Sequence, residues 1–295
     1  MNAMKSGAYP ITLNGEEYGL LFSLNALDEM QERFGGYDKL HEVFNQNNKD
    51  WVKDTRWLFT LLINEARLAE NEYIGMSSGI MDPFAIAMGK KDHAILLDTS
   101  DLSYEYAPLE LPHQKIIVTN SQKARLAVDE RYQERQAQCQ EALHDLQTVI
   151  AIQNLSELTA DVFEQVQEMI RRPVCLRRAR HAVTENQRTI QAVEALNKGD
   201  IREFGQLMNA SHLSLKEDFE VSCEELDILV EEAWEIEGVL GSRMMGAGFG
   251  GCTISIVEND AVNEFVSRVG SHYKERTGRT AEFYIMETGN GASDV

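Results

Sequence analysis

Apolar positions near the start of the chain follow two different periods. Asn14-Gly15 separates two short β-like runs within residues 9–23, and this dipeptide is a strong signal for a two-residue hairpin turn. From 24 to 34, apolar residues recur at helical spacing, and residues 51–72 continue that pattern over a longer segment. The pattern predicts a β-hairpin followed by helices in the first part of the chain.

The pattern changes after a loop of small residues at 74–79. Three strand-like runs follow, which we expect to form a meander, and a helical pattern then dominates residues 124–236. The final part is mixed, with a strand, a helix and another strand. The runs of the expected meander are 93–98, 103–111 and 115–120, and those of the final part are 252–258, 261–278 and 280–287. We therefore predict an α+β fold.

Composition narrows the possible functions. The chain has 295 residues, 43% of them hydrophobic, and a formal net charge of −20, which disfavours nucleic acid as a partner. No apolar run is long enough to cross a bilayer, and the first residues contain no apolar signal core. The four cysteines show neither metal-ligand nor disulfide spacing. We expect a soluble, cytoplasmic protein without a membrane partner.

Basic residues cluster in "RRPVCLRRARH", residues 171–181. Arginines at helical spacing usually form a solvated helix face, and we interpret them in this way. A local binding site for nucleotide phosphates is the alternative.

Glycines are concentrated in "GSRMMGAGFGGCTISIV", residues 241–257. Gly246, Gly248 and Gly251 formally match GxGxxG, but a dinucleotide fingerprint follows a strand and opens a helix. Here the glycines follow a helical pattern and precede a strand, so we reject a dinucleotide site. Two interpretations remain open: a tight turn with close backbone packing, or a backbone surface that approaches a ligand.

Asp82 precedes Pro83 and an apolar run. Asp at an N-cap with Pro at the first helical position is good helix-start chemistry. The helix dipole would also keep this carboxylate ionised, which suits a base that accepts a hydroxyl proton. The two roles are compatible. Taken alone, Glu70 is an ordinary surface glutamate and Tyr132 a half-buried helical tyrosine.

Five segments in the rest of the chain can be considered together: "AENEYIGMSSGIMDPFAIAMGKKDHAILLD", "RYQERQAQC", "RRARHAVTENQRT", "ASHLSLKEDFEVSCEELDILVEEA" and "GSRMMGAGFGGCTISIV". Together they resemble the galactokinases, members of the GHMP kinase superfamily that includes homoserine and mevalonate kinases. They occur in the order typical of that family, and the resemblance spans residues 69–295. The resemblance implies the central and C-terminal part of a GHMP kinase fold: the β-meander, a helical middle and a ferredoxin-like end.

The resemblance also implies a reaction and its residues. Galactose would be phosphorylated at its anomeric hydroxyl by ATP with Mg²⁺. Asp82 in "GIMD" would accept the hydroxyl proton, Glu70 in "AEN" would bind magnesium and Tyr132 in "YQER" would contact galactose. The glycines of the third family motif would line the floor of the active site: Gly246, Gly248, Gly250 and Gly251.

The chain departs from the family pattern in two ways. Position 83 is commonly glutamine in the family, and here it is Pro83. Before residue 69 we find neither the family's sugar-binding signature nor its "GLSSS"-type phosphate loop. Because these parts position ATP and neutralise charge, we expect impaired phosphoryl transfer by this chain.

Residues 1–68 instead resemble a tail assembly chaperone of bacteriophages, which implies a phage tail protein as partner. The chain would then join two unrelated proteins, with a boundary near residues 68–69. This leaves two rivals to the kinase interpretation: a binding or assembly protein that acts through residues 1–68, and a hybrid without function.

Overall fold

The structure is a computed structural model that describes residues 8–13, 16–21, 30, 33–34, 61, 79–124 and 128–291. The chain divides into two compact units. The first comprises Met1–Lys91, Leu97–Glu105 and Gly289–Val295, and the second comprises Asp92–Leu96 and Tyr106–Thr288.

The hairpin expected at the start of the chain is confirmed. Strands β1 (Ala8–Leu13) and β2 (Glu16–Leu21) pair antiparallel, with Leu13 opposite Glu16 across the two-residue connection. The helices expected at 24–34 and 51–72 lie almost entirely outside the described residues. The expected boundary at residues 68–69 also lies outside them and stays a prediction.

Farther along the chain, a short helix precedes a second hairpin. Helix α5 covers Met81–Met88, and strands β3 (His93–Leu97) and β4 (Tyr104–Pro108) form a two-stranded sheet. On the inner side of α5, Phe84 is 5% exposed and packs edge-on against the Tyr104 ring, with 5.3 Å between centroids. Packing of this aromatic pair fixes the side of α5 that is buried.

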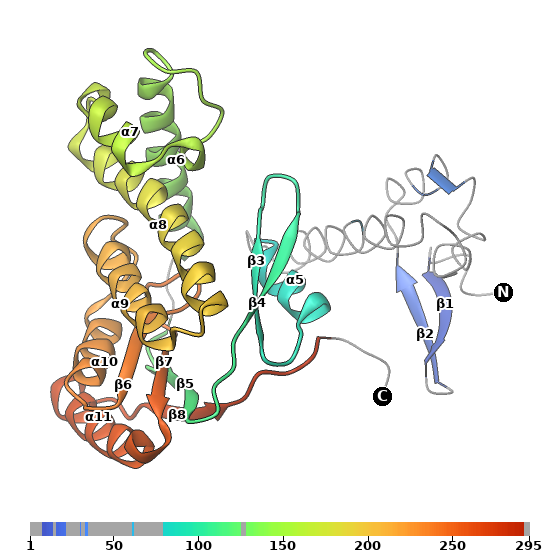
Figure 1. Ribbon diagram of the computed structural model, residues 1–295, viewed down its shortest axis with the longest axis vertical. Helices are drawn as coiled ribbons and strands as arrows, with labels where there is room; N and C mark the ends of the chain where they lie inside the picture. Colours follow the sequence, from blue (N-terminus) through green and yellow to red (C-terminus); the bar gives the residue numbers. More distant parts are fainter. Residues whose placement is uncertain are drawn as a thin grey trace. The chain divides into compact units, whose positions relative to one another are not determined.

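The second unit contains a four-stranded antiparallel sheet in the order β6-β7-β5-β8 (Figure 1). This is the strand order of a ferredoxin-like fold, which confirms the predicted α/β end. The expected three-stranded meander is wrong in its last strand, because both edges of β5 are already paired within this sheet. The strands are β5 (Gln114–Asn120), β6 (Val239–Met244), β7 (Cys252–Glu258) and β8 (Glu282–Met286).

Helices cover both faces of this sheet. Helices α10 (Glu224–Trp234) and α11 (Val262–Thr277) share a core with β5 and β7, in which Ile117, Val257 and Phe265 are at most 2% exposed. Helix α9 (Ile201–Glu217) packs on β6 and β7 through a separate cluster that includes Met208 and Ile256. The neighbouring residues Ile256 and Val257, which face opposite sides of β7, are therefore both buried.

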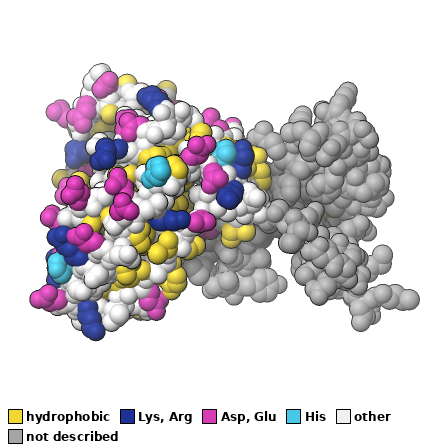
Figure 2. Space-filling model, turned by 60° about the horizontal axis from the view of Figure 1, so that its bottom comes forward, with side chains coloured by type: hydrophobic (Ala, Val, Ile, Leu, Met, Phe, Trp, Pro, Cys, Tyr) yellow, Lys and Arg dark blue, Asp and Glu magenta, His cyan; other side chains and the backbone are white. Residues whose placement is uncertain are grey.

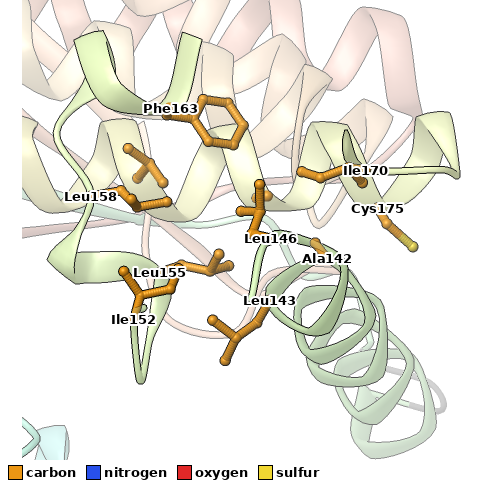
Figure 3. Packing of buried hydrophobic residues seen from close by; sticks show 11 residues of the cluster. Ala142, Leu143, Leu146, Ile152, Leu155, Leu158, Phe163, Ile170 and Cys175 are labelled. Atoms are coloured by element: carbon orange, nitrogen blue, oxygen red, sulfur yellow. The ribbon is translucent and has the colours of Figure 1, made fainter. Parts of the chain in front are cut away.

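Three further helices form their own apolar cluster (Figure 3). On α8, Cys175, Ala179 and Val183 are fully buried, and their spacing of four residues places them on one face. The helices are α6 (Val128–Leu146), α7 (Ala160–Val166) and α8 (Pro173–Asn197), and the short 3₁₀ helices are η3 (Leu155–Glu157), η4 (Gln167–Met169) and η5 (Asn259–Ala261). Among the described helices, none is both long and apolar enough to span a membrane.

Candidate functional site

Asp82 lies in the first turn of α5, as the sequence predicted, and its side chain is exposed. The predicted N-cap is wrong by two positions. Ile80 is the N-cap, because its carbonyl accepts the first helical bond from the Phe84 N–H at 3.0 Å, and no side chain caps this end. Asp82 is therefore the second helical residue and is free of a capping role.

Pro83 consequently occupies the third helical position and not the first. This position is still tolerated, because the first four N–H groups of a helix have no partner within the helix. The absent N–H of Pro83 therefore removes no helical hydrogen bond. Asp82 lies within α5 although a following proline disfavours the helical conformation of the residue before it.

The glycine-rich segment forms the connection between β6 and β7, residues 245–251, which we call the glycine turn. Strand β6 precedes it, so our expectation that a helix precedes the glycines directly is wrong, because β6 intervenes between α10 and the turn. A strand also follows it, so the rejection of a dinucleotide fingerprint holds. Its backbone is unusual, with positive φ at Gly246 (71°), Gly248 (81°), Phe249 (59°), Gly250 (132°) and Gly251 (85°).

Close backbone contacts explain two of these glycines. A Cβ on Gly248 would lie 2.1 Å from the carbonyl oxygen of Val221, and a Cβ on Gly250 would lie 2.9 Å from that of Lys123. The segments that contain Val221 and Lys123 thus pack closely against the turn. The structure supports the first of our two interpretations, close packing, and leaves the turn's contact with a ligand as a proposal.

Hydrogen bonds fasten the turn to these segments. Ser121 donates both its N–H and its hydroxyl to the carbonyl of Gly251, at 2.9 and 2.6 Å. On the other side, the N–H of Phe249 donates to the carbonyl of Val221 at 2.7 Å. The second half of the turn is therefore held at Phe249 and Gly251 by segments that are far away in the sequence.

Tyr132 lies on α6 and is 36% exposed. Its neighbour Arg131 places its guanidinium 5.1 Å from the centre of the Phe249 ring, which is a cation–π contact. The structure thus brings this part of α6 beside the glycine turn, as expected if both contribute to one site. The contact of Tyr132 with a sugar stays a prediction.

The α9–α10 loop, residues 218–223, contacts the glycine turn as well as helices α6 and α8. Arg135 donates to the carbonyls of Phe219 and Glu220 at 2.8 and 3.1 Å. Arg178 is 1% exposed and donates to the carbonyl of Asp218 and to the carboxylate of Glu220. The hydrogen bond from Arg178 holds the pKa of Glu220 below its usual value.

These contacts correct in part our interpretation of the basic cluster as a solvated face, which holds for Arg171 and Arg172. Arg178 and His181 are buried, because α8 turns this side toward α6 and α9. His181 stacks on Phe219 with 4.5 Å between ring centres, and its Nδ1 lies 3.0 Å from the Ser214 hydroxyl. Burial lowers the pKa of His181 to about 4.

The surface carries charges of both signs. On the face shown in Figure 2, lysine and arginine side chains stand among aspartate and glutamate side chains. This mixture agrees with a chain whose net charge is −20. On this face the basic side chains form no continuous track of the kind that a nucleic-acid backbone requires.

The metal ligand predicted from the sequence, Glu70, lies outside the described residues. Within the described part, no three His, Cys, Asp or Glu side chains gather as a protein metal cage would need. Magnesium carried by nucleotide phosphates requires only one or two protein carboxylates. The described residues therefore do not test the predicted metal site.

Comparison with known proteins gives consistent matches. Residues 192–275 match the family described as GHMP kinases C terminal. The chain is 53% identical to the galactokinase of Fusobacterium nucleatum over 235 residues, and 50% identical to that of Levilactobacillus brevis over 234 residues. Each match covers 79% of this chain and 60% of the relative. The chain therefore spans about three fifths of the length of these relatives.

Solved structures agree. A crystal structure of Lactococcus lactis galactokinase complexed with galactose matches with a TM-score of 0.76 and 44% identity. That match covers 80% of this chain and 61% of the other chain. The matched part of the chain is homologous to galactokinases. Mevalonate kinase of L. major, with a TM-score of 0.51 and 20% identity, shares the fold alone.

The galactokinase homology agrees with the motifs recognised in the sequence, and the fold is that of GHMP kinases, as predicted. Asp82 belongs to the first unit, whereas Tyr132 and the glycine turn belong to the second. Their meeting in one galactokinase-type site stays a prediction, and so do the roles of the individual residues.

Sequence reasoning missed the two buried arginines. A usable signal existed for Arg178, which lies three residues after Cys175 and one before Ala179, next to the buried stripe of α8. A charged residue next to a buried helix stripe indicates that its charge is paired with hydrogen-bonding partners inside the protein. Arg135 offered no comparable signal, because its partners are backbone carbonyls about 85 positions away.

Proposed function

We propose that this chain supplies the catalytic base and the C-terminal part of a kinase that phosphorylates galactose at its anomeric hydroxyl. ATP is the phosphoryl donor, with Mg²⁺, and the product is galactose 1-phosphate. The observation that carries the proposal is about 50% identity to galactokinases across 79% of the chain. The cytoplasm is the proposed location, as the sequence led us to expect.

In this proposal Asp82 accepts the proton of the anomeric hydroxyl while the phosphoryl group is transferred. Its position supports the role, because the carboxylate is exposed, makes no capping bond and lies at the positive end of α5. A carboxylate at this place can accept a proton from a bound hydroxyl. Bound magnesium would neutralise charge on the phosphates, with Glu70 as its proposed protein ligand.

Tyr132 and the glycine turn form the proposed wall of the sugar site. The cation–π contact of Arg131 with Phe249 supports this, because it links the Tyr132 segment to the turn. We assign galactose contact to Tyr132, and the floor of the site to the turn that contains Gly246, Gly248, Gly250 and Gly251.

We also propose that the 295-residue chain turns over slowly by itself. Residues 1–68 contain no glycine-rich phosphate loop and no sugar-binding signature of the family. A general base contributes only about 10²–10⁴-fold to a rate, and ATP would be poorly positioned without the loop. Asp82 alone would therefore give little product.

The test is a product assay with galactose, ATP and magnesium. We would compare the chain with a fusion in which residues 1–68 are replaced by the N-terminal half of a complete galactokinase. We expect galactose 1-phosphate from the fusion and little from the chain. A fusion that folds but makes no galactose 1-phosphate would contradict the proposed function, and rapid turnover by the chain would contradict the proposed impairment.

A binding role for residues 1–68 is the second candidate function. The segment that resembles a tail chaperone contains the β1–β2 hairpin, which Asn14-Gly15 predicted. A pull-down with phage tail-tube proteins tests it, and retention that requires residues 1–68 would support it. Absence of both retention and sugar phosphorylation would favour a hybrid without function.

A further inference from the structure

Two buried arginines from different helices converge on one short loop. Arg135 of α6 donates to two successive backbone carbonyls of the α9–α10 loop, and Arg178 of α8 donates to a third. The Nε of Arg178 is held in turn by Gln138 at 2.8 Å. Guanidinium groups suit this arrangement, because they present several donors in a rigid plane. The loop is thereby fixed along its backbone.

The next residue of the same loop contacts the glycine turn. Val221 accepts the Phe249 N–H at 2.7 Å, and its carbonyl leaves no room for a Cβ on Gly248. Phe249 has a φ of 59°, a conformation that non-glycine residues adopt only when their surroundings enforce it. The Val221 carbonyl supplies part of that constraint. A shift of the loop would release the Phe249 N–H.

We propose that Arg135 and Arg178 are positioning residues that fix the glycine turn through the α9–α10 loop. Their importance for sugar phosphorylation rests on the proposed function, but the coupling to the turn does not. The arginines act at a distance from the turn, and the chain of contacts runs from guanidinium to loop carbonyls to Val221 and then to Phe249.

The loop provides the acceptors that the buried charge of Arg178 requires. A buried guanidinium is costly unless its donors are satisfied, so Arg178 requires acceptors in fixed places. Glu220 supplies the compensating carboxylate, with one oxygen on Arg178 at 2.5 Å and the other on Arg177 at 2.8 Å. Its side chain is 43% exposed, so it can be changed without opening the core.

Hydrogen exchange tests the coupling in the full chain. The variants are Arg178→Lys, which keeps the charge and loses the planar fork, and Glu220→Gln, which removes the paired charge. The control is Arg172→Gln at the N-cap of the same helix, α8. The ion pair of Arg172 with Glu141 (2.6 Å) does not involve the loop. Exchange is followed in a peptide covering 245–251 and in one covering α11, with thermal unfolding alongside.

We expect the turn peptide of Arg178→Lys to exchange about tenfold faster, the effect of losing roughly one net hydrogen bond. Glu220→Gln should give a smaller increase of the same kind, while α11 in both variants and all peptides of Arg172→Gln remain unchanged. Unchanged turn exchange in both variants would overturn the proposal. An equal increase in the turn and in α11 would also overturn it, since that result indicates general destabilisation.

The experiment needs no sugar and no ATP, so its outcome is separate from that of the product assay. If Arg178→Lys fails to fold, Glu220→Gln alone decides the matter by the same two peptides.

Discussion

Asp82 lies in the exposed first turn of a helix of eight residues, whereas Gly248 lies in a turn that is pressed between two distant segments. The backbone at Asp82 is regular, and the residue makes no capping bond. The backbone of the glycine turn is in the positive-φ region at five positions and depends on Val221 and Ser121 for its hydrogen bonds. The backbone conformation at Asp82, the proposed base, therefore depends on its own helix. The conformation of the glycine turn, part of the proposed wall of the sugar site, depends on tertiary contacts.

This difference predicts how each region responds to substitution. Changes at Asp82 should affect chemistry and leave stability alone, because its side chain supports nothing in the fold. Changes in the turn or in its supports should first affect stability and local exchange, because the conformation is maintained by packing.

The largest effect on stability is expected for Gly248→Ala. The new Cβ would meet the Val221 carbonyl at 2.1 Å and would also be strained by the φ of 81°. We expect a loss of about 3 kcal/mol in the free energy of unfolding, from overpacking and backbone strain together. Denaturant unfolding measures it.

Gly278→Ala is the matched control. Gly278 ends α11 with a φ of 72°, and nothing lies within 4 Å of its added Cβ. It should therefore lose only the conformational part, about 1 kcal/mol. Equal losses at the two glycines would show that contact with Val221 does not constrain the turn.

A pH-dependent effect is expected from His181, which lies under the α9–α10 loop. Burial lowers its pKa from 6.5 to about 4, so the unfolded chain binds this proton more readily than the folded chain. The stability that depends on a neutral His181 is therefore fully present above pH 6.5. As the pH falls from 6.5 toward 4, the free energy of unfolding decreases by roughly 3 kcal/mol from this residue.

Stability measured between pH 7 and 4 should therefore fall less steeply in His181→Phe than in the unchanged chain. His144→Gln serves as the control, because His144 is exposed on α6. Parallel curves for His181→Phe and the unchanged chain would contradict the burial of a neutral His181 beneath the loop.

The smallest effect is expected for Arg172→Gln. Its ion pair with Glu141 joins side chains that are 56% and 40% exposed, so solvent screens the attraction. The free energy of unfolding should change by about 0.5 kcal/mol or less. A loss as large as that of Gly248→Ala would show that the exposed ion pair at the N-cap of α8 is not screened by solvent.

Much of this architecture could be predicted from sequence because it is periodic. Helix α11 and strand β7 begin within one residue of the expected positions, and helices α9 and α10 lie within the expected helical region 124–236. Strand β6 was missed because Gly241, Ser242 and Arg243 are poor strand residues, and its strand state comes from pairing with β7 and packing under α9.

The remaining errors are non-local in the same way. The partners of β5 come from the last part of the chain, more than 130 positions away, so no local pattern could separate it from the hairpin before it. The N-cap of α5 was misplaced because Asp-Pro is a strong start signal, while the structure places Ile80 there instead. For the candidate site, Asp82 was found through its motif, whereas the supports of the glycine turn required the structure.

The most direct test of the proposed catalytic role is the substitution Asp82→Asn in the fusion that carries a complete N-terminal half. Asp161→Asn is the control, because Asp161 is also an exposed acid in the first turn of a helix, α7. We predict that Asp82→Asn lowers the rate of galactose 1-phosphate formation by about 10²–10⁴-fold, with the free energy of unfolding unchanged, and that Asp161→Asn changes neither. Undiminished phosphorylation by Asp82→Asn would contradict the account.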